Sequence, residues 1–329
     1  LMIDDNTVIQ ANYYNTNYYK PEYVNENFDC FVIPLADAFR ENFVNELNEL
    51  TSFVKKLKIP CYVIGVGLKE SYEPDFSQPK PQDEAVKKFV TAVLEKSNCI
   101  GVRGELTGKY LETLGFAEGR DFMVIGCPSM YMKGKRLHIQ NPKLDVNSKV
   151  CFNSNVAASV PTRKFIKLKM KEFENHYFIG QVVNELRSIY LGAPYEYKIE
   201  YNFRNVTDKI YQDGRLRFFC NVPKWMEFLN DSDLTFGSRL HGNIAAVLAG
   251  TPALLVTKDS RTRELAEYHH LNAIHESKLN EKLTLQDLVE QQDFTQIEKY
   301  QKQNLDRYVA FLKKNDIPNI FMDGEDPQE

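Results

Sequence analysis

The sequence predicts an α/β protein built from two doubly wound domains. Short apolar runs alternate with helical patterns, and a polar stretch interrupts this alternation near the middle of the 329-residue chain. Strand–helix alternation is typical of parallel sheets with helices on both faces. One hydrophobic core rarely organises more than about 250–300 residues, so a chain of this length is expected to form two domains.

The first half contains four predicted strands, at residues 28–34, 61–67, 99–103 and 122–126. Helical patterns lie between them at residues 41–58, 83–97 and 105–114, and Gly115 follows the last of these as its expected C-cap. The polar stretch at residues 133–148 contains Gly134, Asn141, Pro142 and Asn147 and separates two regions that each look able to fold. We therefore expect one domain over residues 1–145 and another over 146–329.

The second half repeats the alternation. Its strand candidates are residues 149–152, 177–179, 217–220, 234–236 and 253–257, and residues 286–315 form a charged, amphipathic helical region. These elements predict a second doubly wound domain.

Composition excludes several classes of protein. The net charge is −4 and the pI is about 6.0, so no basic surplus favours a nucleic-acid partner. No apolar run approaches the roughly 20 residues of a membrane span, and the amino end lacks the apolar stretch of a signal peptide, which predicts a cytoplasmic protein. The six cysteines form no CxxC pair, so we expect buried, inert thiols and no metal site.

The most informative segment is the turn at residues 237–243, GSRLHGN. It follows the predicted strand 234–236 and opens a helix of small residues that ends at Gly250 and Pro252. In an open α/β sheet this turn lies at the carboxyl edge, where ligands bind. The N–H groups of the first helical turn favour an anion, and Gly242 permits close approach of the backbone.

Arg239 and His241 supply the chemistry of this turn. A guanidinium can hold a carboxylate or phosphate through two parallel hydrogen bonds, and an imidazole can exchange a proton near neutral pH. The pair suits a reaction that handles an anionic group and moves a proton. The alternative is that His241 is a structural hydrogen-bonding residue of the turn.

A resemblance to a known family rests on three segments. SRLHGNIAAVLAGTPALL with the following DSRTRELAEY, the upstream GVRGELTGKYLETLG, and VIGCPSMY all resemble elements of the polysaccharide pyruvyl transferase family. The resemblance implies a GT-B-like pair of Rossmann-type domains that face a central cleft, the amino-terminal one on the acceptor side. It also implies phosphoenolpyruvate as donor, no separate cofactor, and a sugar acceptor that is often polymeric or lipid-linked.

The same resemblance implies roles for individual residues. Arg239 would bind the donor's anionic groups, His241 would transfer protons, and Arg103 would be a second anion-binding arginine. Ser238, Gly242 and Asn243 would complete the substrate-binding turn. With a lipid-linked acceptor the enzyme would work at the inner face of the membrane through at most peripheral contact, and the sequence is compatible with an oligomer.

The chain departs from the family pattern in two places. Cys127 stands where many members have Asp, so no carboxylate is assigned there. The usual glycine-rich loop after a first strand is missing between Leu1 and Phe28, and the chain starts with Leu. We expect this numbering to begin downstream of that element.

Two further arginines are candidates for substrate binding. Arg163 follows the strand at 149–152 and is expected either in the cleft or on a solvated helix face. Arg261 and Glu264 follow the strand at 253–257, so one of them could reach the donor. Their alternative is a surface ion pair worth about 0.5 kcal/mol.

Two other functions compete with pyruvyl transfer. A GT-B glycosyltransferase with a nucleotide-sugar donor would also need an anion site at a helix start, so fold alone does not separate the two. A glycan-binding or scaffold protein that keeps the turn without its chemistry is the non-enzymatic alternative.

Overall fold

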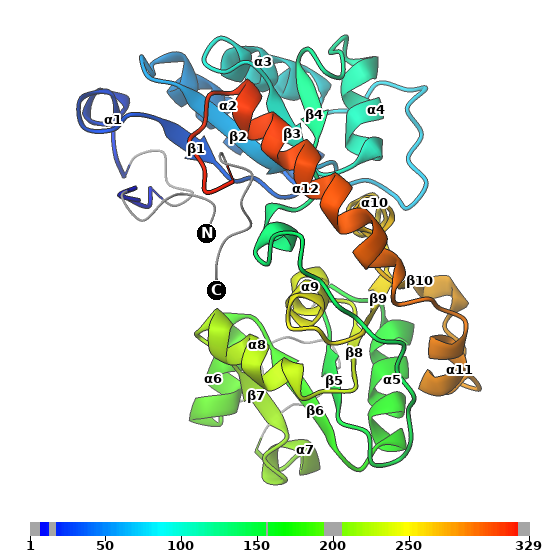
Figure 1. Ribbon diagram of the computed structural model, residues 1–329. Helices are drawn as coiled ribbons and strands as arrows, with labels where there is room; N and C mark the ends of the chain where they lie inside the picture. The colour runs from blue at the N-terminus through cyan, green and yellow to red at the C-terminus, as the bar shows by residue number, and fades with distance from the viewer. Residues whose placement is uncertain (1–6, 13–17, 156, 194–205, 322–329) are drawn as a thin grey trace. The chain divides into compact units, whose positions relative to one another are not determined.

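The computed structural model describes residues 7–12, 18–155, 157–193 and 206–321 (Figure 1). The chain divides into two compact units. Unit 1 comprises Leu1–Lys135, Asp259–His269 and Gln301–Glu329, and unit 2 comprises Arg136–Lys258 and His270–Tyr300. Each unit contains one parallel sheet.

Unit 1 is built on a four-stranded sheet in the order β1-β2-β3-β4. Its strands are β1 (Phe31–Ile33), β2 (Cys61–Val66), β3 (Ile100–Val102) and β4 (Phe122–Val124), and each lies within a predicted strand. Its helices include α1 (Pro21–Asn27), the 3₁₀ turn η1 (Glu41–Phe43), α2 (Val44–Lys55), α3 (Asp83–Leu94), α4 (Glu105–Thr113) and η2 (Pro128–Tyr131). The strand–helix order predicted for this half is confirmed.

Helix α3 shows how the sequence pattern becomes packing. Its buried residues recur every three or four positions and include Val86, Phe89, Val90 and Val93, none of which is exposed to solvent. This spacing places them on one face of the helix. That face packs against α2 and the sheet and forms part of the core of unit 1.

Two segments from the second half of the chain belong to unit 1, namely α10 (Ser260–His269) and most of α12 (Gln296–Lys314). Tyr268 donates a hydrogen bond to the Val124 carbonyl, and Asn315 accepts from the backbone N–H groups of Asn98 and Cys99. Phe311 is fully buried against Gly101. The structure therefore differs from the expected division into 1–145 and 146–329, because an amphipathic helix does not encode which sheet covers its apolar face.

Unit 2 is built on a six-stranded parallel sheet in the order β10-β9-β8-β5-β6-β7. The strands are β5 (Val150–Asn153), β6 (His176–Gly180), β7 (Leu216–Phe218), β8 (Leu234–Gly237), β9 (Ala253–Thr257) and β10 (Ala273–His275). This is the doubly wound Rossmann order, in which the chain starts in the middle and builds outward on both sides. The predicted α/β fold with two Rossmann-type sheets is confirmed. The sequence missed β10, a three-residue edge strand that is only partly buried.

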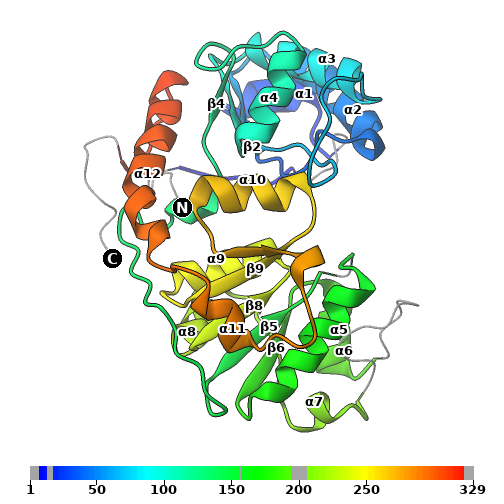
Figure 2. The same ribbon diagram turned by 90° about the vertical axis from the view of Figure 1, so that its right-hand side faces the viewer.

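The helices of unit 2 are α5 (Val160–Lys169), α6 (Val183–Leu191), α7 (Lys209–Gln212), α8 (Val222–Asn230), α9 (Leu240–Leu248) and α11 (Leu285–Glu290), with short 3₁₀ turns η3 (Met170–Glu172) and η4 (Glu276–Lys278). Helices α5 and α8 lie on opposite sides of the sheet (Figures 1 and 2). Helix α9 is buried along almost its whole length and packs on α8 and β9. Within the described ranges, no helix is long and apolar enough to cross a lipid bilayer.

Glycine at position 237 is required by packing. A Cβ atom built there would lie 1.9 Å from the backbone oxygen of Asn153, which is far inside van der Waals contact. We expect Gly237→Ala to lower the free energy of unfolding by about 1–3 kcal/mol or more, because a backbone atom must move. Urea unfolding measures this change.

Gly119→Ala is the matched control, since Gly119 also adopts a positive φ, but a Cβ atom there would have no neighbour within 4 Å. The control should show only the backbone cost of roughly 1 kcal/mol. Equal losses in the two variants would contradict the clash with Asn153.

Candidate functional site

The predicted turn lies at the point where the sheet of unit 2 changes direction. Strands β5 and β8 are neighbours, and Asn153 at the end of β5 pairs in register with Gly237 at the end of β8. From β5 the chain builds toward β7, and from β8 it builds toward β10. In doubly wound sheets ligands bind outside the carboxyl ends of the strands at such a switch point.

The turn between β8 and α9 is held by two buried asparagines. Asn153 accepts the Arg239 N–H on its Oδ1 at 2.8 Å, and its backbone oxygen accepts the Ser238 N–H. Asn243 donates to the carbonyls of Gly237 and Arg239 and is 1% exposed. Asn243 thus stabilises the turn through its buried side chain. The Ser238 hydroxyl stabilises the loop that follows β5 by accepting the Asn155 N–H at 2.8 Å.

Arg239 is anchored through one edge of its guanidinium group. Its Nε donates to the Ser154 carbonyl at 2.8 Å, and its Nη2 donates to Glu185 Oε1 at 3.1 Å. The side chain is 13% exposed, whereas Glu185 is fully buried. Nη1 makes no hydrogen bond to any part of the chain that the structure describes, so it can donate to a ligand.

Glu185 organises more than Arg239. Its second oxygen accepts the backbone N–H groups of Gln181 and Val182, which begin the loop between β6 and α6. A buried carboxylate is strongly destabilising unless it is paired and hydrogen-bonded, and here both oxygens are used. The result is a fixed unit that joins the ends of β5, β6 and β8.

His241 lies in the first turn of α9 and is exposed to solvent. Gly242 follows it, and a Cβ atom there would come within 2.4 Å of Gln181 Nε2 and 3.3 Å of Asn153 Nδ2. The glycine therefore allows polar side chains to crowd over the helix start. Arg239 is the N-cap and makes no side-chain hydrogen bond to the first turn. This helix start, with a partial charge of roughly +0.5, can attract an anion.

Arg163 is buried, which contradicts one of the two positions expected for it, the solvated helix face. It lies in α5, is only 5% exposed, and donates from Nη1 to the Ala158 carbonyl at 2.8 Å. This bond ties Arg163 to the loop immediately before its own helix. The expectation of a solvated helix face is wrong.

Arg103 lies at the end of β3 in unit 1 and is 6% exposed. Its Nε donates to the Gly65 carbonyl, and its backbone N–H donates to Val66. Its Nη1 is buried and has no hydrogen-bond partner among the described residues. Arg103 therefore resembles Arg239 in one respect, since part of its guanidinium is fixed while a donor remains available.

Glu264 on α10 is buried in unit 1 rather than paired at the surface, so the expectation of a surface ion pair is wrong for this residue. It is 1% exposed and accepts hydrogen bonds from the N–H and hydroxyl groups of Thr107, in the first turn of α4. Burial raises the pKa of Glu264 to about 8, against the opposing effects of Thr107 and the nearby Arg103. Gly67 and Gly104 leave room for this carboxyl group.

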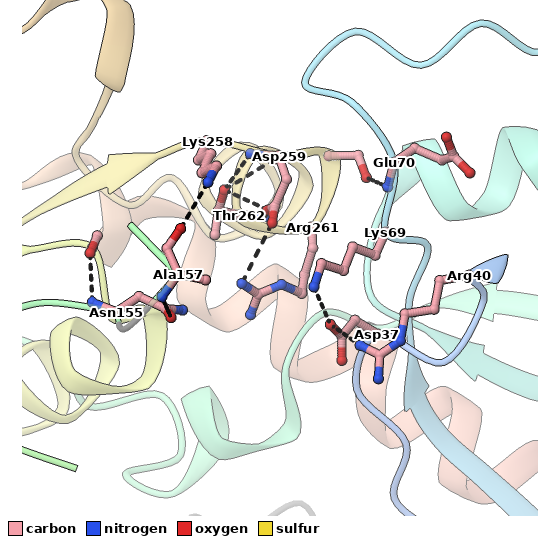
Figure 3. Close-up of polar contacts among 12 residues, drawn as sticks. Asp37, Arg40, Lys69, Glu70, Asn155, Ala157, Lys258, Asp259, Arg261 and Thr262 are labelled. Carbon is pink, nitrogen blue, oxygen red and sulfur yellow. Dashed lines mark hydrogen bonds and ion pairs between the residues drawn. The ribbon is translucent and has the colours of Figure 1, made fainter. Parts of the chain in front are cut away.

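Arg261 begins α10 in unit 1 and is 17% exposed. Its Nη2 lies 3.7 Å from Asp259, the ion pair drawn in Figure 3.

Of the residues singled out in the sequence, Arg239, His241, Ser238, Gly242 and Asn243 share one turn in unit 2. Arg103 and Arg261 belong to unit 1.

Sequence reasoning missed Asn153 and Glu185. Asn153 directly follows the predicted strand at residues 149–152 and is the last residue of β5. Glu185 lies five residues after the end of β6. A polar residue just after a parallel strand is a usable signal, but only the strand order shows that β5, β6 and β8 are adjacent.

The sequence model of the polysaccharide pyruvyl transferase family matches residues 4–260. The chain belongs to this family. The matched region contains both the Arg103 segment and the turn with Arg239 and His241, as the resemblance of the motifs indicated. This polysaccharide pyruvyl transferase family member is accordingly an enzyme of the transferase class.

Solved structures with similar folds share little sequence with this pyruvyl transferase family member. The UDP-GlcNAc 2-epimerase of Methanocaldococcus jannaschii, in complex with UDP-GlcNAc and UDP, is 13% identical with a TM-score of 0.47, over 89% of this chain and 78% of that one. The glycotransferase of kitacinnamycin is 10% identical with a TM-score of 0.44, over 90% and 78%. No curated protein matches the sequence.

Breaking the ion pair between Glu185 and Arg239 is expected to lower the stability of the protein. Glu185→Gln replaces an acceptor with an amide donor that faces either Arg239 or the loop N–H groups. We expect the free energy of unfolding to fall by about 1–3 kcal/mol, as for a buried polar group left without its partner. Urea unfolding provides the measurement.

Glu227→Gln is the control for this substitution. Glu227 is 68% exposed and pairs with the exposed Lys224, so its substitution should change stability by less than about 0.5 kcal/mol. If Glu185→Gln were as mild as this control, the buried pair would not hold the site together.

The raised pKa of Glu264 predicts that the free energy of unfolding depends on pH. Because its pKa in the folded protein is raised from 4.5 to about 8, the folded state retains a proton that the unfolded chain releases above pH 4.5. Its contribution is complete below pH 4.5 and is lost as the pH rises toward 8, by up to roughly 1.4 kcal/mol per pH unit. Glu264→Gln should flatten the fall of unfolding free energy between pH 5 and 8.5, measured by urea unfolding.

Glu227→Gln, which removes an exposed carboxylate of unit 2, should leave that pH profile unchanged. A wild-type profile that is flat over this range would show that Glu264 ionises normally.

Proposed function

We propose that this enzyme transfers a pyruvyl group from phosphoenolpyruvate to two hydroxyls of a sugar, in a bacterial surface polysaccharide or its lipid-linked precursor. The observation that supports it best is the anchored Arg239 beside His241 at the start of α9. The available Nη1 of Arg239 and the start of α9 together suit a small molecule with a carboxylate and a phosphate. Membership of the family supplies the pyruvyl group as the unit transferred.

Arg239 would act by positioning. The Glu185 carboxylate compensates much of the guanidinium charge, so the remaining attraction comes from oriented N–H donors rather than from a free positive charge. Donors that are fixed before the substrate arrives need no reorganisation during the reaction. Ser154 and Glu185 would keep Arg239 in one orientation while its outer edge holds the donor.

His241 would act as the acid. Protonation of the methylene carbon of phosphoenolpyruvate makes C2 electrophilic, and a sugar hydroxyl then bonds to C2 and loses its proton. Phosphate leaves with the C2–O bonding electrons. A second hydroxyl adds to C2, loses its proton, and closes the ketal, so phosphoenolpyruvate and a diol give the ketal and inorganic phosphate.

Variants of the two central residues test this function through acceptor-dependent phosphate release. We expect His241→Asn to lower kcat by about 10²–10⁴-fold, the usual effect of a lost proton donor. Arg239→Lys should raise KM for phosphoenolpyruvate at least about tenfold, because lysine cannot reproduce the fork of donors. Arg187→Lys, on the exposed side of α6, is the control and should behave as wild type.

Normal turnover by a folded His241→Asn protein would remove this residue from the mechanism. Thermal shift separates donors, because a ligand that binds only the folded state raises its melting temperature. Stabilisation by UDP- or CMP-sugars and not by phosphoenolpyruvate would contradict the proposal and favour a glycosyltransferase.

A further inference from the structure

The side-chain amide of Gln181 lies at the start of α9 and has a buried nitrogen without a hydrogen-bond partner in the described part of the chain. Gln181 directly follows β6, and its Nε2 atom is shielded from solvent. Nε2 occupies the space that a Cβ atom of Gly242 would need. A buried donor without an acceptor is destabilising, and each such group in a native structure requires an explanation.

Asn153 presents a second amide to the same place. It ends β5 and is only 2% exposed. Its Oδ1 atom accepts the Arg239 N–H at 2.8 Å, whereas its Nδ2 atom donates to no described residue. Nδ2 lies 3.3 Å from the position of a Cβ atom at Gly242. The amide nitrogens of Asn153 and Gln181 therefore converge over Gly242.

Both amides are held by the contacts that also hold Arg239. The Gln181 N–H donates to Glu185, and the same carboxylate pairs with Arg239 at 3.1 Å. Asn153 is paired in register with Gly237, the first residue of the turn. These residues all belong to unit 2. Their donors are fixed before a ligand binds, so binding requires little reorganisation.

The place that these amides face favours negative charge. Gly242 belongs to the first turn of α9, a nine-residue helix whose N-terminus carries a partial charge of roughly +0.5. Amide N–H groups donate hydrogen bonds to the oxygen atoms of carboxylates and phosphates. An oxyanion over Gly242 would supply the acceptor that Nε2 of Gln181 and Nδ2 of Asn153 lack.

We propose that Gln181 and Asn153 are donor-binding residues, whose amide N–H groups hold an oxyanion of the donor over Gly242. The oxyanion is either the carboxylate or the phosphate of phosphoenolpyruvate. This inference rests on the proposed function for the identity of the donor, whereas the binding of an oxyanion can be tested without it. Neither residue belongs to the turn itself, and their position beside α9 follows from the strand order.

Gln181→Met tests the proposal, because it removes the amide and nearly preserves the volume of the side chain. Isothermal titration calorimetry at low salt measures the binding of phosphoenolpyruvate, inorganic phosphate and pyruvate. We expect phosphoenolpyruvate to bind this variant at least about tenfold more weakly than wild type, the loss typical of a hydrogen bond to a charged group. Gln212→Met, which replaces an exposed amide of α7 in unit 2, is the matched control and should bind as wild type does.

The two small anions identify which oxyanion the amides hold. Weaker binding of inorganic phosphate to Gln181→Met assigns the amides to the phosphate of the donor, and weaker binding of pyruvate assigns them to its carboxylate. Unchanged affinity for all three ligands, or an equal loss in Gln212→Met, overturns the proposal.

The melting temperature of the ligand-free protein separates binding from a structural role. Because Nε2 of Gln181 has no described partner, an apolar group in its place should leave this temperature unchanged or raise it. A Gln181→Met protein that melts at a lower temperature and binds phosphoenolpyruvate normally would show that the amide is structural. If Gln181→Met does not fold, Gln181→Glu repeats the titrations, since it keeps the shape and places a negative charge against the donor. Normal affinity in Gln181→Glu also overturns the proposal.

The proposed function fails separately. Absence of phosphoenolpyruvate turnover in the wild type would remove pyruvyl transfer, but the expected effect of Gln181→Met on phosphate or pyruvate binding would remain. Conversely, a Gln181→Met protein with wild-type affinity and wild-type KM for phosphoenolpyruvate would reject the amides as donor-binding groups and retain pyruvyl transfer.

Discussion

The buried ion pair between Glu185 and Arg239 is the interaction on which the site of unit 2 depends. A fully buried carboxylate needs partners for both oxygens, and Glu185 finds them in Arg239 and in two loop N–H groups. Satisfying this one group joins the ends of three strands. The turn between β8 and α9 is therefore held in place because a buried carboxylate requires hydrogen-bond partners.

Unit 1 also contains a buried glutamate that needs hydrogen-bond partners, but its partners differ from those of Glu185. Glu264 is also buried at the carboxyl end of a parallel sheet, but its main donors are the neutral groups of Thr107. Burial consequently dominates, and its pKa rises to about 8. Two buried glutamates in comparable places therefore have different roles: Glu185 holds an arginine in position, whereas Glu264 joins α10 to the start of α4.

Charge in this enzyme is organised locally rather than over the whole chain. The net charge of −4 gives no sign of local positive charge, yet cationic side chains lie near the ends of parallel strands in both units. In each unit a carboxylate pairs with them and compensates part of the charge.

The sequence by itself determined the strand–helix order, the two Rossmann-type sheets and the turn that carries Arg239 and His241. These features are local, because periodicity, glycines and caps act within a few residues. Tertiary structure alone decided that Glu185 and Asn153 meet Arg239, since their adjacency depends on strand order. It also decided that α10 and α12 belong to unit 1 and that Arg163 is buried. An apolar helix face or a charged side chain does not encode its partner, which is chosen only when distant segments pack together.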